Sequence, residues 1–257
     1  MKDSIIKSKT TSVGLDSNGH SHLLGTSDLT EPVVDRCLSH LTNCDLSCLD
    51  WTIVLATGRS GSTTVQQMIS KLPAMNFYGE EGGLLKSFHA LQENIIDQKH
   101  GGLSWLGSMD SNVCTVACMT QKFYAERHGI NCLQRGCKHG WKEIRYKSPK
   151  DIEWIRTVFP SSRIVLNYRS KCSDNYKDGF GRNCDKILEQ SRSLLNATGK
   201  LTNTFHMEFE QINNLTKWQE LSTFIGYENC KASNVTKANT NEEYTMAEKS
   251  YNPWTCR

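Results

Sequence analysis

The chain has 257 residues, a length that suits one α/β domain with a sizeable core of its own. Lys and Arg number 30 against 27 Asp and Glu, and the resulting formal net charge of +3 is too mild to indicate nucleic-acid binding. No run of about 18 apolar residues occurs, so the sequence predicts no membrane span; it leaves the oligomeric state open.

The pattern of apolar and polar residues predicts a polar tail followed by alternating strands and helices. Residues 1–30 lack periodicity and are rich in Ser, Thr and Gly, so we expect a flexible N-terminal tail or stem, with a single α/β domain over residues 31–257. Strands that alternate with helices indicate a parallel sheet with helices on both faces, as in P-loop NTPases. A short helical pattern is expected at 32–49, strands at 52–57, 76–78, 140–146, 163–168 and 204–209, helices at 62–71, 84–97, 152–159, 173–195 and 218–225, and a loop and helix pair at 100–135.

The segment Gly58-Arg59-Ser60-Gly61-Ser62-Thr63-Thr64 joins the first strand to the first helix. Its glycines let backbone N–H groups approach a phosphate, and the helix N-terminus adds partial positive charge. Arg59 supplies a permanent cation, and the hydroxyls of residues 62–64 supply short donors. This order of strand, tight loop and helix predicts a site for a phosphorylated ligand, with an ordinary Gly- and Ser-rich turn as the alternative.

The spacing of this loop differs from that of a Walker A motif. Gly58 and Gly61 are three residues apart, and Ser62 stands where the Walker lysine would be. The loop therefore lacks the usual equipment for ATP hydrolysis.

A second arginine-bearing turn, Tyr168-Arg169-Ser170-Lys171, follows the fourth expected strand. Ligands of parallel α/β sheets bind at the carboxyl ends of the strands, so the turns at Arg59 and Arg169 should meet at one edge. Two anion sites at one edge suit a nucleotide that is phosphorylated at two separate positions. A surface salt bridge is the alternative role for Arg169.

The two motifs resemble the nucleotide-binding motifs of sulfotransferases that use 3′-phosphoadenosine 5′-phosphosulfate (PAPS). Residues 58–64 resemble their 5′-phosphosulfate loop, and Arg169 matches the arginine of their 3′-phosphate motif, where a serine usually follows eight residues later. That position is Lys177 here, and Ser173 lies four residues on, so either could partner Arg169. Further segments resemble bacterial and Golgi-type carbohydrate sulfotransferases, in order over about residues 51–227: 79–83, 140–146, 159–164, 207–212 and 224–226.

The resemblance implies transfer of a sulfuryl group from PAPS to a hydroxyl or amine of an acceptor, with a carbohydrate as the expected acceptor. Its Gly-Glu element assigns the general base to Glu80, with the adjacent Glu81 in reserve and His89 as a weaker candidate. No metal is needed, because positioning and cations around the transferred group lower the barrier. The acceptor is expected to meet Glu81, Lys142 and Arg145, and PAPS to meet Arg59, Ser60, Gly61, Ser62, Thr63, Thr64, Arg169, Ser173 and Lys177.

Two other functions remain open from the sequence. A nucleotide or small-molecule kinase could use the same kind of sheet, although the Walker lysine is missing. A catalytically inactive, cysteine-stapled module could keep the fold and only bind glycans. ATP turnover with magnesium would indicate the first, and loss of nucleotide binding would indicate the second.

Eleven cysteines favour disulfide bonds and an oxidising compartment. The N-terminus shows no apolar region of a signal peptide, and the three Asn-x-Thr sequons are as many as chance provides. We expect the Golgi lumen or the secretory pathway, with the cytoplasm as the alternative. Zinc is the alternative to disulfides for the pairs Cys114 with Cys118 and Cys132 with Cys137, which have His128 and His139 nearby. The spacings match no common zinc finger.

Overall fold

The computed structural model describes residues 50–100, 109–127, 138–146, 148–173, 176, 181–199, 201–235 and 252–256, and all of them belong to one compact unit, Val33–Arg257. The expected tail at residues 1–30 and the expected short helix at 32–49 lie outside the described residues and stay predictions.

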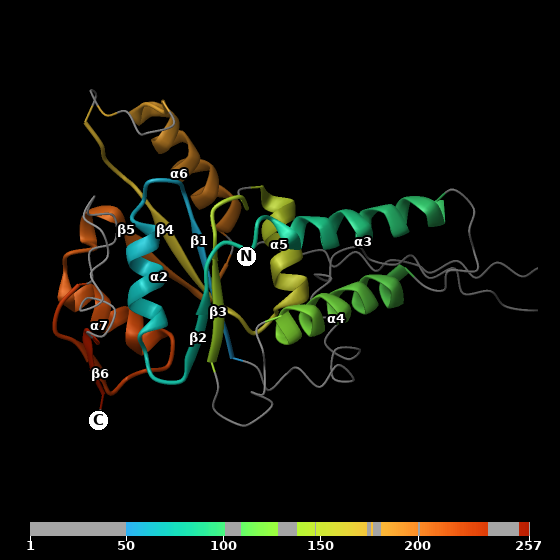
Figure 1. Ribbon diagram of the computed structural model, residues 1–257. Coiled ribbons are helices and arrows are strands. Elements are labelled where there is room, and N and C mark those ends of the chain that lie inside the picture. Colours follow the sequence, from blue (N-terminus) through green and yellow to red (C-terminus); the bar gives the residue numbers. More distant parts are fainter. Residues whose placement is uncertain are drawn as a thin grey trace, which may run out of the picture. The chain divides into compact units, whose positions relative to one another are not determined.

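A five-stranded parallel sheet forms the centre of the fold (Figure 1). The strand order is β2-β3-β1-β4-β5, so the chain crosses over several times and the first strand lies in the middle. The apolar, β-branched sequences of β1 and β4 and the helices between the strands explain why the centre of the sheet is parallel and buried. The strands are β1 (Asp50–Ala56), β2 (Met75–Tyr78), β3 (Lys138–Glu143), β4 (Arg163–Tyr168) and β5 (Thr204–Glu208).

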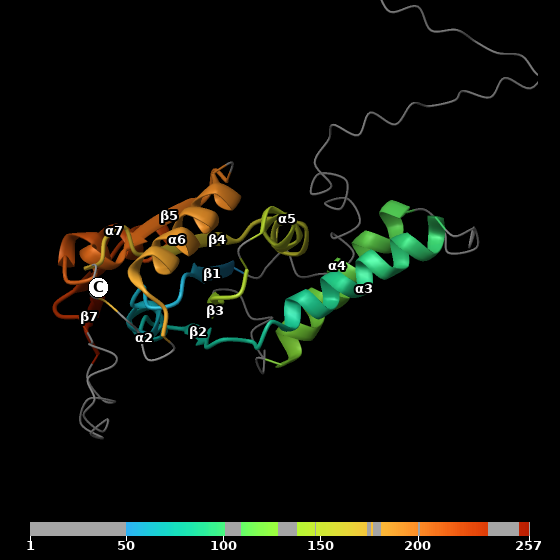
Figure 2. The same cartoon turned by 90° about the horizontal axis from the view of Figure 1, so that it is seen from above.

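Helices cover both faces of the sheet, which confirms the predicted α/β class. Alternate residues of β1 point to opposite faces: Val54 packs with Val65 in one apolar core, and Leu55 packs with Leu194 in the other. Figures 1 and 2 show α3 and α4 lying side by side. One apolar core, with α2 and α7, lies on one face of the sheet, and the other core, with α3 to α6, lies on the opposite face. The helices are α2 (Ser62–Ser70), α3 (Leu84–His100), α4 (Met109–Arg127), α5 (Pro149–Val158), α6 (Cys184–Thr198), the 3₁₀ turn η3 (Phe209–Gln211) and α7 (Leu215–Phe224).

The predicted helix at 173–195 is wrong at its start, because α6 begins at Cys184. Asn183 takes an extended conformation and its side chain accepts a hydrogen bond from the Lys186 N–H at 3.1 Å, which caps the helix at this point. Gly181 before it has a left-handed φ of 72°, which a continuing helix does not allow.

The third strand also differs from its prediction at 140–146, because β3 spans Lys138–Glu143. The N–H groups of Ile144 and Arg145 donate to the Glu143 carboxylate, at 2.9 and 3.1 Å, instead of to a neighbouring strand. The buried side chain of one residue therefore ends the strand.

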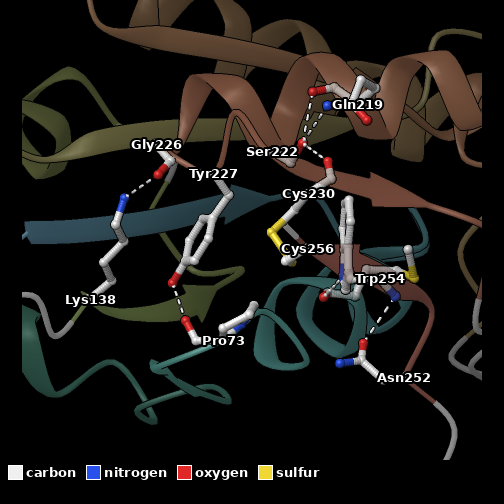
Figure 3. The surroundings of a disulfide bond; sticks show 11 residues. Pro73, Lys138, Gln219, Ser222, Gly226, Tyr227, Cys230, Asn252, Trp254 and Cys256 are labelled. Atoms are coloured by element: carbon white, nitrogen blue, oxygen red, sulfur yellow. Dashed lines mark hydrogen bonds between the residues drawn. A yellow bond between two sulfur atoms is a disulfide. The ribbon is translucent and has the colours of Figure 1, made fainter.

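A small antiparallel hairpin of β6 (Cys230–Ala232) and β7 (Trp254–Cys256) closes the C-terminal part of the fold (Figure 3). The Cys230–Cys256 disulfide joins its two strands. The buried Trp254 indole donates to the Met68 carbonyl at 2.8 Å, and the Tyr227 hydroxyl donates to the Pro73 carbonyl at 2.8 Å. The hairpin and the turn before it therefore hold the C-terminal end of α2, a contact that no motif in the sequence indicated.

Of the cysteines for which the sequence left zinc as an alternative, the structure describes Cys114 and Cys118. Both form disulfide bonds. Within the described ranges, no group of three or more His, Cys, Asp or Glu side chains could hold a metal ion. His139 is buried in β3, and Cys132, Cys137 and His128 lie outside the described residues. A separate search of the same ranges finds no helix with the length and apolar character that crossing a membrane requires.

We predict that the buried His139 makes the fold sensitive to acid. Its ring lies against Trp51, with centroids 5.5 Å apart, and within the described ranges neither ring nitrogen has a hydrogen-bond partner. Burial lowers the pKa of His139 below its ordinary value of 6.5, so the unfolded chain binds a proton more readily than the folded one. Stability should therefore be complete above about pH 6.5 and decline below it.

Urea unfolding at pH 7.5 and at pH 5.5 checks this expectation. His139→Leu should reduce the loss of stability between the two pH values, whereas His206→Leu, a change on the exposed face of the edge strand β5, should leave it as in the wild type. An equal loss in the wild type and in His139→Leu would contradict the prediction.

Candidate active site

The loop between β1 and α2 leaves the start of the helix without a capping side chain. Arg59 and Gly61 take left-handed φ values of 66° and 75°, so the chain turns sharply and Gly61 becomes the N-cap without a capping side chain. Within the described part of the chain, no acceptor contacts the N–H groups of Gly61, Ser62 or Thr63. Unpartnered N–H groups and the helix dipole attract an anion. Three other helices have a capping side chain: Ser148 for α5, Asn183 for α6 and Asn214 for α7.

Ser60 anchors the loop to the sheet. Its buried hydroxyl lies 2.6 Å from the Thr57 carbonyl and 2.7 Å from Oδ1 of Asn167. Asn167 in turn donates from Nδ2 to the Met207 carbonyl at 2.9 Å, which connects the loop through β4 to β5. The Ser60 hydroxyl is thus occupied within the protein, and a ligand at the loop would meet the Ser60 backbone rather than its side chain.

Gly58 and Gly61 lack a side chain, so side chains from later parts of the chain can approach the loop backbone closely. The sequence did not identify these side chains. A Cβ at Gly58 would lie 2.7 Å from Nη1 of Arg182, so this guanidinium rests directly on the loop. A Cβ at Gly61 would collide with Ile212 and lie 3.1 Å from the Phe209 ring. Arg182 directly precedes the N-cap of α6, and only the folded chain brings this further cation to the loop.

Arg169 lies at the carboxyl end of β4, directly beside the loop. Its Nε donates to the Arg59 carbonyl at 3.2 Å, and its backbone N–H donates to the Ser191 hydroxyl at 3.3 Å. The guanidinium carbon lies 3.7 Å from the centroid of the Phe209 ring and 5.1 Å from that of Tyr176. The two arginine-bearing turns therefore meet at one edge of the sheet. Among the described residues, nothing bonds to the terminal nitrogens Nη1 and Nη2 of Arg169.

Of the two predicted partners of Arg169, the structure describes Ser173. Ser173 is exposed, and its carbonyl accepts a hydrogen bond from the Tyr176 N–H at 2.9 Å. Lys177 lies outside the described residues, so the choice between Ser173 and Lys177 stays a prediction. The Cys172–Cys184 disulfide ties the turn after Arg169 to the first residue of α6.

Glu80, Lys142 and Arg145 lie together, beyond the end of β2. Oε1 of Glu80 is 3.1 Å from Nζ of Lys142, and Oε2 is 3.3 Å from Nη1 of Arg145. Lys142 pairs in register with Val54 of β1, so its buried stem lies on the face that carries α2. A Cβ at Gly79 would lie 3.4 Å from the Gln66 side chain of α2, which places the segment before Glu80 against that helix.

The two other proton-transfer candidates lie near aromatic side chains. Burial raises the pKa of the Tyr78 phenol, and the nearby charge of Glu81 raises that pKa further. The His89 ring stacks on Trp154, with an interplanar angle of 10°, and Nε2 lies 3.9 Å from Glu93. These contacts give His89 a packing role on α3.

An open hollow of about 500 Å³ adjoins Arg145. Its volume falls in the range of small-molecule sites. Charged and hydroxyl side chains predominate in its wall, which consists of Lys86, Arg145, Ser148, Pro149, Asp151 and Ser193.

No protein-family model matches the chain, and no curated protein matches it. Two solved structures of mycobacterial sulfotransferases are similar at low identity. STF1 from Mycobacterium tuberculosis H37Rv is 10% identical over 76% of this chain and 72% of its own, with a TM-score of 0.39. STF9 from Mycobacterium avium is 12% identical over 75% of this chain and 69% of its own, with a TM-score of 0.33. Both of these proteins are described as sulfotransferases.

We predict that Gly61→Ala destabilises the fold more than Gly82→Ala. Both glycines have left-handed φ values, 75° and 67°, so each alanine adds about 1–2 kcal/mol of strain. A Cβ at Gly82 meets nothing within 4 Å, whereas one at Gly61 collides with Ile212, which adds about 1–3 kcal/mol of overpacking. Urea denaturation measures the difference, and equal losses for the two variants would show that the packing around Gly61 yields without cost.

Proposed function

We propose that this protein transfers a sulfuryl group from PAPS to a hydroxyl or amine of an acceptor, with a carbohydrate as the acceptor class. One observation carries the proposal: Arg169 donates to the backbone of Arg59, so the two turns that we propose as anion sites adjoin at the sheet edge. Each site alone would suit any phosphate. Together they suit a nucleotide that carries an anionic group at each of two positions, as PAPS does.

The open N-terminus of α2 supports binding of the 5′-phosphosulfate. The N–H groups of Gly61, Ser62 and Thr63 and the cation of Arg59 would hold this group, and the Thr63 and Thr64 hydroxyls lie at the same turn. The terminal nitrogens of the Arg169 guanidinium would hold the 3′-phosphate, for which a planar cation gives two hydrogen bonds.

Glu80 is the proposed general base. As the acceptor oxygen attacks sulfur, a bond forms between them, the bond from sulfur to the 5′-phosphate oxygen breaks, and the acceptor proton passes to Glu80. Lys142 and Arg145 each contact one oxygen of this carboxylate and so fix its direction, while each oxygen keeps a lone pair for the proton. The leaving nucleotide departs as 3′-phosphoadenosine 5′-phosphate (PAP).

The polar hollow beside Arg145 supports a carbohydrate acceptor. Hydroxyl and charged groups in its wall suit the hydroxyls of a sugar, whereas a sterol would need apolar walls. The disulfides of the described cysteines support the lumen of the secretory pathway as the place of action.

We predict that the protein binds PAP more tightly than AMP, and that Arg169→Gln abolishes this preference. A charge-assisted hydrogen bond is worth about 1.5–3 kcal/mol, so the 3′-phosphate should contribute roughly 10- to 100-fold in affinity. Calorimetric titration of PAP and AMP into the wild type and Arg169→Gln measures the preference.

Arg156→Gln is the matched control for this titration, because Arg156 lies in the last turn of α5 and should leave both affinities unchanged. Absence of PAP binding to the wild type would contradict the proposed function and favour a glycan-binding module. Turnover of ATP with magnesium would favour a kinase.

We predict that Glu80→Gln keeps PAP affinity within about twofold and lowers sulfuryl transfer by roughly 10²- to 10⁴-fold, the contribution of general base catalysis. Transfer is measured with labelled PAPS and a panel of glycans, phenols, sterols and amines. Glu93→Gln, an exposed change on α3, should retain full activity. Unchanged turnover in Glu80→Gln would remove Glu80 from the mechanism.

A further inference from the structure

Glu143 is a fully buried carboxylate that the proposed mechanism does not use. It is the last residue of β3 and pairs in register with Leu55 in the middle of the sheet. A buried carboxylate is costly unless charge and hydrogen bonds compensate it, so its partners indicate what it does for the protein.

Each oxygen of Glu143 has partners from the candidate active site. Oε1 accepts from the N–H groups of Ile144 and Arg145, at 2.9 and 3.1 Å, and from Nη1 of the Arg145 guanidinium at 2.9 Å. Oε2 accepts from the Gly83 N–H at 3.3 Å. One buried side chain thus binds the end of β3, a guanidinium and the turn that follows Glu80.

Arg145 carries the effect of Glu143 to the proposed base. The same nitrogen, Nη1, contacts Glu143 and lies 3.3 Å from Oε2 of Glu80. The Glu143 hydrogen bond and charge also raise the pKa of Arg145. With nearly half of its side chain exposed, Arg145 would sample many rotamers without this anchor.

The backbone gives a second connection to Glu80. Gly82 and Gly83 both have left-handed φ values, 67° and 81°, and so turn the chain between Glu80 and α3. The Gly83 carbonyl accepts from the Lys86 N–H at 2.9 Å in the first turn of α3. The Gly83 N–H, three residues after Glu80, donates a hydrogen bond to Glu143 and so holds this turn against β3.

We propose that Glu143 is a positioning residue for the proton transfer: through Arg145 and the Gly83 turn it holds Glu80 in the orientation in which it accepts a proton. This inference rests on the proposed function. Glu143 touches neither substrate nor the reacting atoms, and its whole effect on rate passes through Glu80.

A double-mutant cycle tests the proposal without knowledge of the acceptor, because PAPS can transfer its sulfuryl group to water. The sulfur–oxygen bond to the 5′-phosphate breaks, a bond to the water oxygen forms, and Glu80 takes the proton. Release of labelled sulfate from PAPS is measured for the wild type, Glu143→Gln, Glu80→Gln and the double variant, together with PAP affinity by calorimetry.

We expect Glu143→Gln to lower sulfate release at least tenfold and to keep PAP affinity within about twofold. The double variant should be no slower than Glu80→Gln alone, because residues that act through one group are not additive. Losses that multiply in the double variant, or a matching fall in PAP affinity, would overturn the proposal, since either would show a general structural role.

Asp50→Asn is the matched control, because Asp50 is a carboxylate paired with Arg163 and Lys138 at the opposite end of the same sheet. It should lower stability and leave the rate per folded molecule unchanged. If Glu143→Gln does not fold, Glu143→Asp keeps the charge but withdraws it from Arg145, and the same cycle applies. A wild type that fails to bind PAP contradicts the proposed function itself, whereas one that binds PAP and shows no coupling contradicts only the role of Glu143.

Discussion

The contact between the ends of β1 and β4 is the constraint on which the site depends. The ladder between these strands continues past β1, where the Thr57 N–H donates to the Asn167 carbonyl at 3.0 Å. The Ser60 hydroxyl and the Arg169 guanidinium then bind the loop to β4 from two sides. Because adjacent parallel strands end at the same edge, the start of α2 and Arg169 lie side by side. Packing of Phe209 against both Gly61 and Arg169 keeps them together.

Charge pairing organises the cluster around Glu80. Along the sheet edge, anions and cations alternate from Lys142 through Glu80 and Arg145 to the buried Glu143. Each charge that leaves water gains an opposite neighbour, which offsets the cost of desolvation. The Glu80 carboxylate is held by two cations and stays partly exposed. The arrangement favours precise orientation over flexibility.

Sequence patterns predicted most of the architecture. The apolar runs of β1 and β4 and the 3.6-residue spacing of Val65, Met68 and Ile69 specify strands and a helix locally, since burial of one face drives each element. The glycines of the loop predict a turn, because few residues besides glycine adopt a left-handed φ at low cost. Where side chains compete for backbone groups, prediction failed: Glu143 ended β3 early, and Asn183 set the start of α6.

The sequence by itself determined the parallel α/β sheet and the turn between its first strand and first helix. It also indicated Arg59 and Arg169 as candidate residues and, through the resemblance, Glu80. The tertiary structure alone decided that Glu80 lies between Lys142 and Arg145, that Arg182 rests on Gly58, and that the Ser60 hydroxyl faces the sheet. The physical reason is the range of the interactions. Periodicity and turn chemistry act between residues a few positions apart, whereas these contacts join residues some 60 to 120 positions apart, and only the crossovers of the strands bring them within hydrogen-bond distance.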